Sequence, residues 1–257
     1  MAKTIRVNET PLVLYTLRRA DDALILGHRL SEWCGHAPMM EEDMALANMA
    51  LDLIGQARSL YTYAGEAEGG GRTEDDFAYW RDERGYRNVL LVEQQNGDFA
   101  RTILRQFLYA HFADLYWRAM MASKDATLAA IAAKSEKEMA YHVRHAGEWV
   151  IRLGDGTAES HARIAAALED LWPYTGELFE MDASEKALVD AGIAVDLSAL
   201  RERWRANVKA VLDEATLTTP ADGWMQKGGR TGIHSEHLGH LLAELQHVQH
   251  TIPGAVW

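Results

Sequence analysis

Apolar residues recur at alternating spacings of three and four along two long stretches of the chain, the pattern of a helix that buries one face. In the first stretch the recurring positions are Leu46, Met49, Leu53, Gln56, Leu60 and Tyr63. In the second stretch they are Leu128, Ile131, Ser135, Met139, His142, Ala146, Trp149 and Leu153. We therefore predict two long helices packed in a core, with the polar side chains of Gln56 and His142 pointing inward.

Capping and helix-breaking residues place these stretches in a set of four long helices. Thr10-Pro11 is a favourable start for the first helix, and Gly65 with the glycine cluster 69–71 is expected to end the second. Asp98 is expected to cap the third helix, and residues 123–125 lead into the fourth. The expected helices run from 11 to about 33, 38 to about 64, 98 to about 122 and 125 to about 154.

The remaining segments complete the predicted fold. Residues 72–97 lack a sustained helical stripe and are interpreted as a long ordered crossover that contains short helices. Shorter helices are expected at about 158–179, 185–191, 197–215 and 233–250. Four long helices with one long central crossover predict an all-α, ferritin-like four-helix bundle. We expect a single domain over 1–257, with the core bundle at about 10–154 and additional C-terminal helices at about 157–257.

Composition supports an all-α chain and excludes some partners. The apolar content of 48% is ample for a core, and the five prolines leave 39–172 free for uninterrupted helices. The formal net charge of −12 opposes binding to nucleic acid. The only cysteine, Cys34, is interpreted as a small buried hydrophobe in a reducing compartment. Without an apolar signal core or a membrane-length apolar run, we expect a cytoplasmic protein with no membrane contact.

The two patterned helices lack the ligands that a di-iron bundle would carry at their inner positions. Such bundles use Glu-x-x-His, because residues three apart share a face and offer a carboxylate and an imidazole to one iron. Here the residue three before His142 is Met139, and the corresponding slot in the other helix reads Leu53 to Gln56. A thioether or an alkyl group cannot supply the hard anionic oxygen that iron requires. We predict a bundle that retains the architecture of a di-iron protein without its metal site.

One intact Glu-x-x-His remains, at Glu244 and His247, in a histidine-rich segment. The other histidines there are His234, His237, His240 and His250. On a helical projection His240, Glu244 and His247 lie opposite a leucine face. Either this side is a solvated or interface face, which the projection favours, or it binds metal, for which no second Glu-x-x-His exists.

Three other features allow two interpretations each. Asp52 stands among apolar residues, so it is either functional or paired, and Arg18 or Arg144 is the expected partner. His111 and Asp114 could join a metal site, but a capped or paired role is favoured. The glycine-rich loop 228–232 lacks the context of a phosphate-binding loop and is a weak signal.

Four long strings give the chain a resemblance to a known family. They are GHRLSEWCGHAP (27–38), MALANMALDLIGQAR (44–58), RDERGYRNVLLVEQQNGDFARTILRQ (81–106) and GGRTGIHSEHLGHLLAEL (228–245). Together they resemble the C subunits of the phenylacetyl-CoA 1,2-epoxidases, the ring-hydroxylating phenylacetyl-CoA oxygenases, over nearly the whole chain.

The resemblance implies a non-catalytic, structural subunit in aerobic phenylacetate catabolism. In that family the related A subunit holds the di-iron centre and binds phenylacetyl-CoA. A small B subunit joins the hydroxylase, and a reductase with flavin and iron–sulfur groups delivers electrons from NADPH. The related A subunit has Asp-Glu-x-Gly-His at positions 52–56 and Lys-Glu-Glu-x-x-His at 137–142. The resemblance therefore marks Leu53, Gln56, Met139 and His142 as degenerate ligand positions, of which His142 alone keeps its ligand-type residue.

On this basis we assign no catalytic, cofactor-binding or metal-ligating residue to the chain and expect a homo- or hetero-oligomer. Two other functions stay open: a ferritin-like di-metal oxygenase or oxidase active on its own, and a ferritin-like protein outside aromatic degradation. The aromatic segment 77–80 is a candidate for part of the partner surface. Its alternative role is to anchor the crossover to its own bundle.

Overall fold

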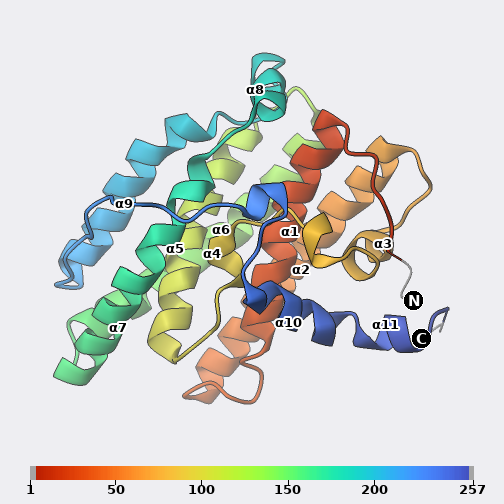
Figure 1. Ribbon diagram of the computed structural model, residues 1–257. Coiled ribbons are helices and arrows are strands. Elements are labelled where there is room, and N and C mark those ends of the chain that lie inside the picture. Colours follow the sequence, from red (N-terminus) through yellow and green to blue (C-terminus); the bar gives the residue numbers. More distant parts are fainter. Residues whose placement is uncertain (1–3, 255–257) are drawn as a thin grey trace.

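The four predicted long helices form the centre of the molecule in the computed structural model, which describes residues 4–254 (Figure 1). They are α1 (Pro11–Ser31), α2 (Met40–Glu68), α5 (Phe99–Met120) and α6 (Ala126–Gly154). Within the described range the remaining elements are also helical and no strand occurs. The all-α, ferritin-like prediction is confirmed.

The bundle pairs α1 with α2 and α5 with α6, and α2 also packs against α6. The crossover from α2 to α5 contains α3 (Glu74–Tyr79), the 3₁₀ turn η1 (Glu83–Gly85) and α4 (Leu90–Glu93). This is the ordered crossover with short helices that the sequence predicts.

Two N-caps lie at the predicted residues, Thr10 and Asp98, and a third lies at Asp125, within the segment expected to lead into the fourth helix. The Thr10 hydroxyl accepts from the Val13 backbone N–H at 3.3 Å. The Asp98 carboxylate accepts from the N–H of Arg101 at 2.9 Å, and Asp125 caps α6. Each side chain satisfies a backbone donor that has no partner inside its helix, which fixes where the helix begins.

The predicted bounds of α2 are wrong at both ends. The helix begins at Met40 rather than Pro38, and it continues past Gly65 to Glu68. A Cβ atom on Gly65 would lie 2.4 Å from the carbonyl oxygen of Arg72, so glycine is needed there for a close approach of the returning chain. The helix ends at Gly69, whose left-handed φ of 71° suits glycine.

The buried stripe of α6 departs from the predicted one towards the ends of the helix. Leu128, Met139 and Ala146 are buried as expected, but Trp149 and Leu153 are only partly buried, and Val150 is fully buried instead. An α-helix has 3.6 residues per turn, so a strict three-and-four pattern drifts off one face over many turns. In α2 the stripe shows the same behaviour at Tyr63, which is only partly buried.

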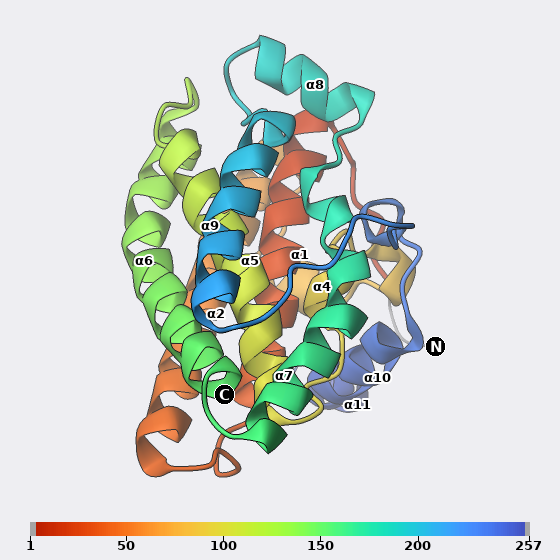
Figure 2. The ribbon, with the colours of Figure 1, turned by 90° about the vertical axis from the view of Figure 1, so that its left-hand side faces the viewer.

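The C-terminal segment covers the bundle with shorter helices, several of which differ from their predicted bounds. They are α7 (Ala158–Leu171), η2 (Trp172–Tyr174), η3 (Gly176–Phe179), α8 (Ala183–Asp190), η4 (Leu197–Leu200), α9 (Arg201–Glu214), η5 (Gly229–Thr231), α10 (Glu236–Leu245) and α11 (His247–Thr251). Helices α7 and α9 pack on α5 and α6, and α8 packs on α1. In Figure 2, α6 lies on one side of the molecule and α10 and α11 on the opposite side.

The single helix predicted at 233–250 is two helices that meet at Gln246. The buried Gln246 amide donates to the carbonyl oxygens of Ala78 at 3.1 Å and Arg81 at 2.9 Å. These bonds hold the junction of α10 and α11 against the crossover beside α3.

The aromatic segment 77–80 anchors the crossover to its own bundle. Phe77 is fully buried and stacks on Tyr61 with ring centroids 5.9 Å apart. Trp80 stacks on His250 at 5.1 Å, and the His250 ring donates to the Tyr79 carbonyl at 2.7 Å. Of the two roles considered for this segment, these contacts favour internal anchoring.

Candidate functional site

The four degenerate ligand positions come together in the centre of the bundle, between α2 and α6. Leu53, Met139 and His142 are fully buried, and Gln56 is 4% exposed. The inward direction predicted for both polar side chains is therefore confirmed.

The His142 imidazole has a polar partner at each nitrogen. Its Nδ1 lies 3.0 Å from the amide nitrogen of Gln106 on α5, and its Nε2 lies 3.3 Å from a carboxylate oxygen of Asp52. An amide N–H only donates, so Nδ1 accepts, and the proton on Nε2 is directed to the carboxylate. His142 is thus a core histidine with its hydrogen-bonding capacity used inside its own chain.

The predicted arginine partner of Asp52 is wrong. Its carboxylate contacts His142, and its side chain is 37% exposed, because the residue lies at the edge of the α2 stripe. Arg18 instead pairs with Asp182 and, at 2.8 Å, with Glu185. An acid at this edge reaches water and needs no cationic partner.

Gln56 forms a second contact between the same two helices. Its amide nitrogen donates to a carboxylate oxygen of Glu138 at 2.9 Å. Glu138 and Asp52 each stand one residue before a ligand position, at 139 and 53 respectively. One residue turns a helical side chain by about 100°, so both carboxylates lie at the α2–α6 edge and not at the bundle centre.

These residues do not fit a di-iron centre. Leu53 and Met139 present no oxygen donor, Gln56 is bound to Glu138, and the His142 imidazole is held by Gln106 and Asp52. Over residues 4–254, no group of three or more His, Cys, Asp or Glu side chains is arranged to hold a metal ion. That this chain carries no metal nevertheless stays a prediction.

The histidine-rich segment divides into two kinds of residue. His240, Glu244 and His247 are exposed, as the leucine face predicts. His234 is in contrast largely buried, with Nδ1 2.8 Å from Glu93 and Nε2 3.1 Å from the Tyr86 carbonyl oxygen. Burial lowers the pKa of His234, but the hydrogen bond and charge of Glu93 outweigh it, and the pKa is raised. The segment thus includes a solvated face and a buried hydrogen bond between His234 and Glu93.

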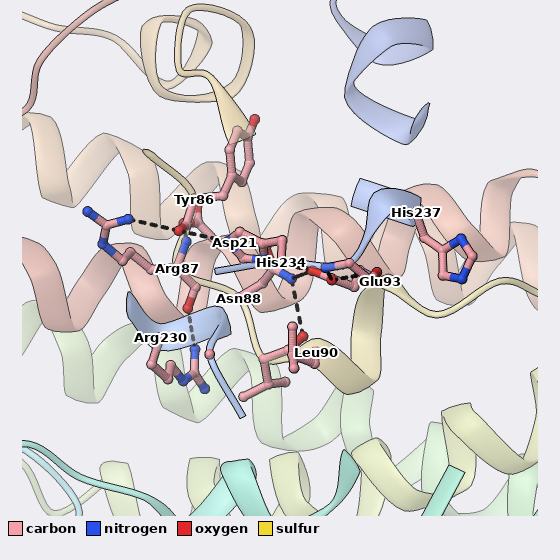
Figure 3. A network of polar contacts seen from close by, with 12 residues as sticks. Asp21, Tyr86, Arg87, Asn88, Leu90, Glu93, Arg230, His234 and His237 are labelled. Atoms are coloured by element: carbon pink, nitrogen blue, oxygen red, sulfur yellow. Dashed lines mark hydrogen bonds and ion pairs between the residues drawn. The ribbon is translucent and has the colours of Figure 1, made fainter. Parts of the chain in front are cut away.

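A buried network on α1 holds the crossover in place. Asp21, fully buried, accepts from the Arg81 guanidinium at 3.0 and 2.5 Å, from the Tyr61 hydroxyl at 2.5 Å and from the Arg87 backbone at 2.7 Å. Figure 3 shows Asp21 beside Arg87 and the crossover chain. Sequence reasoning missed this network, whose one signal is the charged run 18–22 inside an apolar helix.

The glycine-rich loop 228–232 belongs to the same network (Figure 3). Arg230 on this loop donates to both carboxylate oxygens of Asp22, at 3.0 and 2.8 Å. A Cβ on Gly229 would lie 2.0 Å from the Asn88 carbonyl oxygen, so only glycine allows the loop to approach the crossover. Glu177 accepts from the backbone of Gly228 and Arg230 at 3.0 and 3.1 Å. The glycines serve packing and not phosphate binding.

Two further predictions have clear outcomes. Cys34 is exposed, so the prediction of a buried hydrophobe is wrong, because the residue follows the end of α1 in a surface turn.

Asp114 pairs with Arg118 at 2.9 Å, and His111 is buried against the edge of Phe107. Desolvation lowers the pKa of His111 to about 4, which keeps this imidazole neutral near pH 7. The paired alternative is thus confirmed for Asp114.

Among the helices of residues 4–254, none is long and apolar enough to cross a membrane.

Comparison with known proteins shows the family of this chain. The C subunit of the 1,2-phenylacetyl-CoA epoxidase of Escherichia coli (strain K12) is 50% identical over 247 residues, which cover 96% of this chain and 99% of that protein. The family described as phenylacetic acid catabolic protein matches residues 1–257, the whole length of the sequence. The chain therefore belongs to the phenylacetic acid catabolic protein family.

Proposed function

We propose that this chain is a non-catalytic, structural subunit of a phenylacetyl-CoA 1,2-epoxidase that supports a di-iron catalytic A subunit in aerobic phenylacetate catabolism. The observation that carries the proposal is the occupation of the inner α2 and α6 positions by Leu53 and Met139, both fully buried. A relative that is 50% identical and named as the C subunit of such an epoxidase supports the choice of complex.

The proposal extends to the other components. The catalytic A subunit would contribute the di-iron centre, a small B subunit would complete the assembly, and a reductase would contribute flavin and iron–sulfur groups. The chain itself would hold no cofactor and would work in the cytoplasm. Its net charge of −12 supports protein partners over nucleic acid.

In such a complex the chain would act through shape and rigidity. Contacts such as Asp21–Arg81 and Asp22–Arg230 fix its crossover and C-terminal loop on α1. A subunit that binds only the folded state of its partner stabilises that state by mass action. The catalytic subunit would therefore be held in its working form by association, with no side chain of this chain at the reacting atoms.

The main alternative is a ferritin-like di-metal oxygenase or oxidase that acts on its own. Iron analysis of the purified chain separates the two: we expect well under one iron per chain, because one imidazole cannot hold a metal pair. Two tightly bound irons per chain would establish the alternative. A role outside aromatic degradation is opposed by the family to which the chain belongs.

The proposal predicts that His142→Ala leaves turnover of phenylacetyl-CoA by the reconstituted complex within about twofold of wild type. The substitution should instead cost about 1–3 kcal/mol of stability, because the Gln106 amide loses its buried partner. Leaving out the whole subunit should reduce NADPH-dependent substrate oxidation at least about tenfold. The measurement compares complexes containing wild-type chain, His142→Ala or no such subunit, each with its melting curve.

Activity without the subunit equal to that of the full complex would contradict the structural role. A His142→Ala chain that folds, assembles and yet gives an inactive complex would show that this chain takes part in the chemistry.

A further inference from the structure

The first half of α2 carries a second apolar row on its outer side. Met40, Met44 and Leu51 are 73%, 61% and 66% exposed, with Ala47 between them partly exposed. At 100° per residue these four positions lie within a sector of about 60°. We call Met40, Met44, Ala47 and Leu51 the outer row.

The outer row is additional to the row that already packs in the bundle. Leu46, Met49 and Leu53 on the inner side of the same helix are fully buried. A helix at the surface of a single domain shows one apolar face, whereas a helix that is apolar on opposite sides is covered on both. The sequence of α2 therefore predicts that another segment or another chain packs on the outer row.

The described part of the chain supplies no such cover. Helix α3 contacts α2, but its pairing of Glu74 with Arg58 lies beyond the outer row. Helices α7 and α9 pack on α5 and α6, and α8 packs on α1. Helices α10 and α11 lie on the side of the molecule opposite to α6 (Figure 2).

Helix α6 extends this surface with an aromatic ring and basic side chains. Contacts between Glu42 and His145, at 2.8 Å, and between Asp52 and His142 join the edges of α2 and α6. One residue before His142, Tyr141 is 37% exposed. The Arg144 guanidinium carbon lies 5.6 Å from the centre of its ring.

The α6 side of this surface has positive charge although the whole chain is acidic. Lys137 and Arg144 stand four residues before and three after Tyr141, on the same side of the helix. The acidic residues next to them along α6 pair with other cations, Glu138 with Lys134 at 3.5 Å and Glu148 with Arg152 at 3.7 Å. A basic edge on α6 beside an apolar row favours acidic groups on whatever covers it.

We propose that the outer row, with Tyr141, Lys137 and Arg144, docks a helix of the di-iron catalytic subunit, by an apolar helix face with acidic residues beside it. This inference rests on the proposed function and adds to it the surface and the chemistry of the contact. The spacing 40, 44, 47, 51 is that of a seam between two helices crossing at about 20°. Methionine, tyrosine and arginine are enriched at the cores of protein interfaces, and methionine adapts to an irregular partner.

Charge favours a different chain over a second copy of this one. A second copy would bring the same basic edge beside its own Tyr141, so a two-fold contact whose axis passes near Tyr141 would place like charges together. A catalytic subunit with acidic residues at that position would instead place opposite charges together.

The test measures binding of this chain to the purified di-iron A subunit by titration calorimetry. The double variant Met44→Glu/Leu51→Glu should weaken the dissociation constant at least about 100-fold, because two carboxylates would be buried in the contact. Lys137→Glu/Arg144→Glu should weaken it about tenfold, and less so at high salt. Trp224→Glu is the matched control, since Trp224 is 76% exposed on a loop that is tied to α9 through Asp222 and to Pro173 through Gln226, and its binding should stay within about twofold.

All variants change exposed positions, so their melting curves should match that of the wild type. Normal binding by the Met44→Glu/Leu51→Glu variant would overturn the inference and leave the proposed function standing. If that variant loses only the self-association of this chain, the surface belongs to a second copy. The inference is then also overturned and the proposed function stands. Failure of the wild-type chain to bind the A subunit would instead overturn the proposed function, and the inference with it.

Discussion

Asp21→Ala is expected to lower the free energy of unfolding by about 3–5 kcal/mol, the typical cost of removing one partner from a buried ion pair. Asp21 is fully buried, and Arg81 is 2% exposed. The substitution leaves the Arg81 guanidinium in the core with no carboxylate, and with only the carbonyl oxygens of Phe77 at 2.7 Å and Gly85 at 3.0 Å and the Tyr61 hydroxyl at 3.0 Å as acceptors. Denaturant unfolding followed by circular dichroism measures the change.

Asp213→Ala is the control, since Asp213 also pairs with a basic residue but is 56% exposed at its side chain. Exposed pairs contribute about 0–1 kcal/mol, so this variant should remain close to wild type. A loss for Asp21→Ala no larger than that of Asp213→Ala would mean that the Asp21 network is not buried in the protein.

The network matters for function because it joins segments that are far apart in the sequence. Asp21 ties α1 to the crossover, and the neighbouring Asp22 ties it to the loop that carries Arg230. A large loss of stability on Asp21→Ala would show that the crossover is fixed by charge and hydrogen bonding as well as by apolar packing.

The helices were predictable because their signals are local. A three-and-four pattern marks an inner face within a few turns, and a cap such as Asp98 lies beside the backbone donor that it satisfies. The same reasoning failed at Gly65, where the need for glycine comes from the carbonyl oxygen of Arg72 and not from a helix end. The end of α2 depends on a contact that the local sequence does not contain.

The polar contacts were harder to predict, because their partners are distant. Asp21 and Arg81 are 60 residues apart, and Asp22 and Arg230 are 208 residues apart. A charged run such as 18–22 looks locally like a solvated helix face. For Asp52 the error was the assumed burial: residue 52 lies at the edge of the apolar stripe, where water and His142 suffice.

The candidate site could be predicted from the sequence only in part. The inward positions of Leu53, Met139 and His142 follow from helical periodicity, and the absence of oxygen donors at two of them follows from the residues themselves. The contacts of His142 with Gln106 and Asp52, from two other helices, required the fold.

Restoring the ligand residues by Leu53→Glu, Gln56→His and Met139→Glu together is expected to destabilise the metal-free fold by at least about 5 kcal/mol at pH 8. Both new carboxylates would stand at fully buried positions, and the new imidazole at a position that is 4% exposed. The lost Gln56 contact with Glu138 adds to the cost. Thermal and denaturant unfolding in the presence of a chelator measure the change.

The direction of the pH dependence separates buried charge from lost packing. Burial raises the pKa of a carboxyl group in the folded state above its unfolded value of about 4.3. Between these two pKa values the folded state holds the proton and the unfolded state does not, so each rise in pH adds to the penalty. The triple variant should therefore be closer to wild type at pH 5 than at pH 8.

Leu51→Glu makes the same change two residues away on α2, at a position that is 66% exposed, and should leave the free energy of unfolding nearly unchanged at both pH values. If the metal-free triple variant has the same melting temperature as Leu51→Glu and the wild type, the inner rows of α2 and α6 are open to water. The leucine and methionine there would then not be core residues, and the reason for regarding this bundle as a scaffold would fail. A large, pH-dependent decrease in the free energy of unfolding, seen only in the triple variant, would show that apolar packing has replaced the ligand set. The residues at the centre of this bundle would then serve to stabilise the fold.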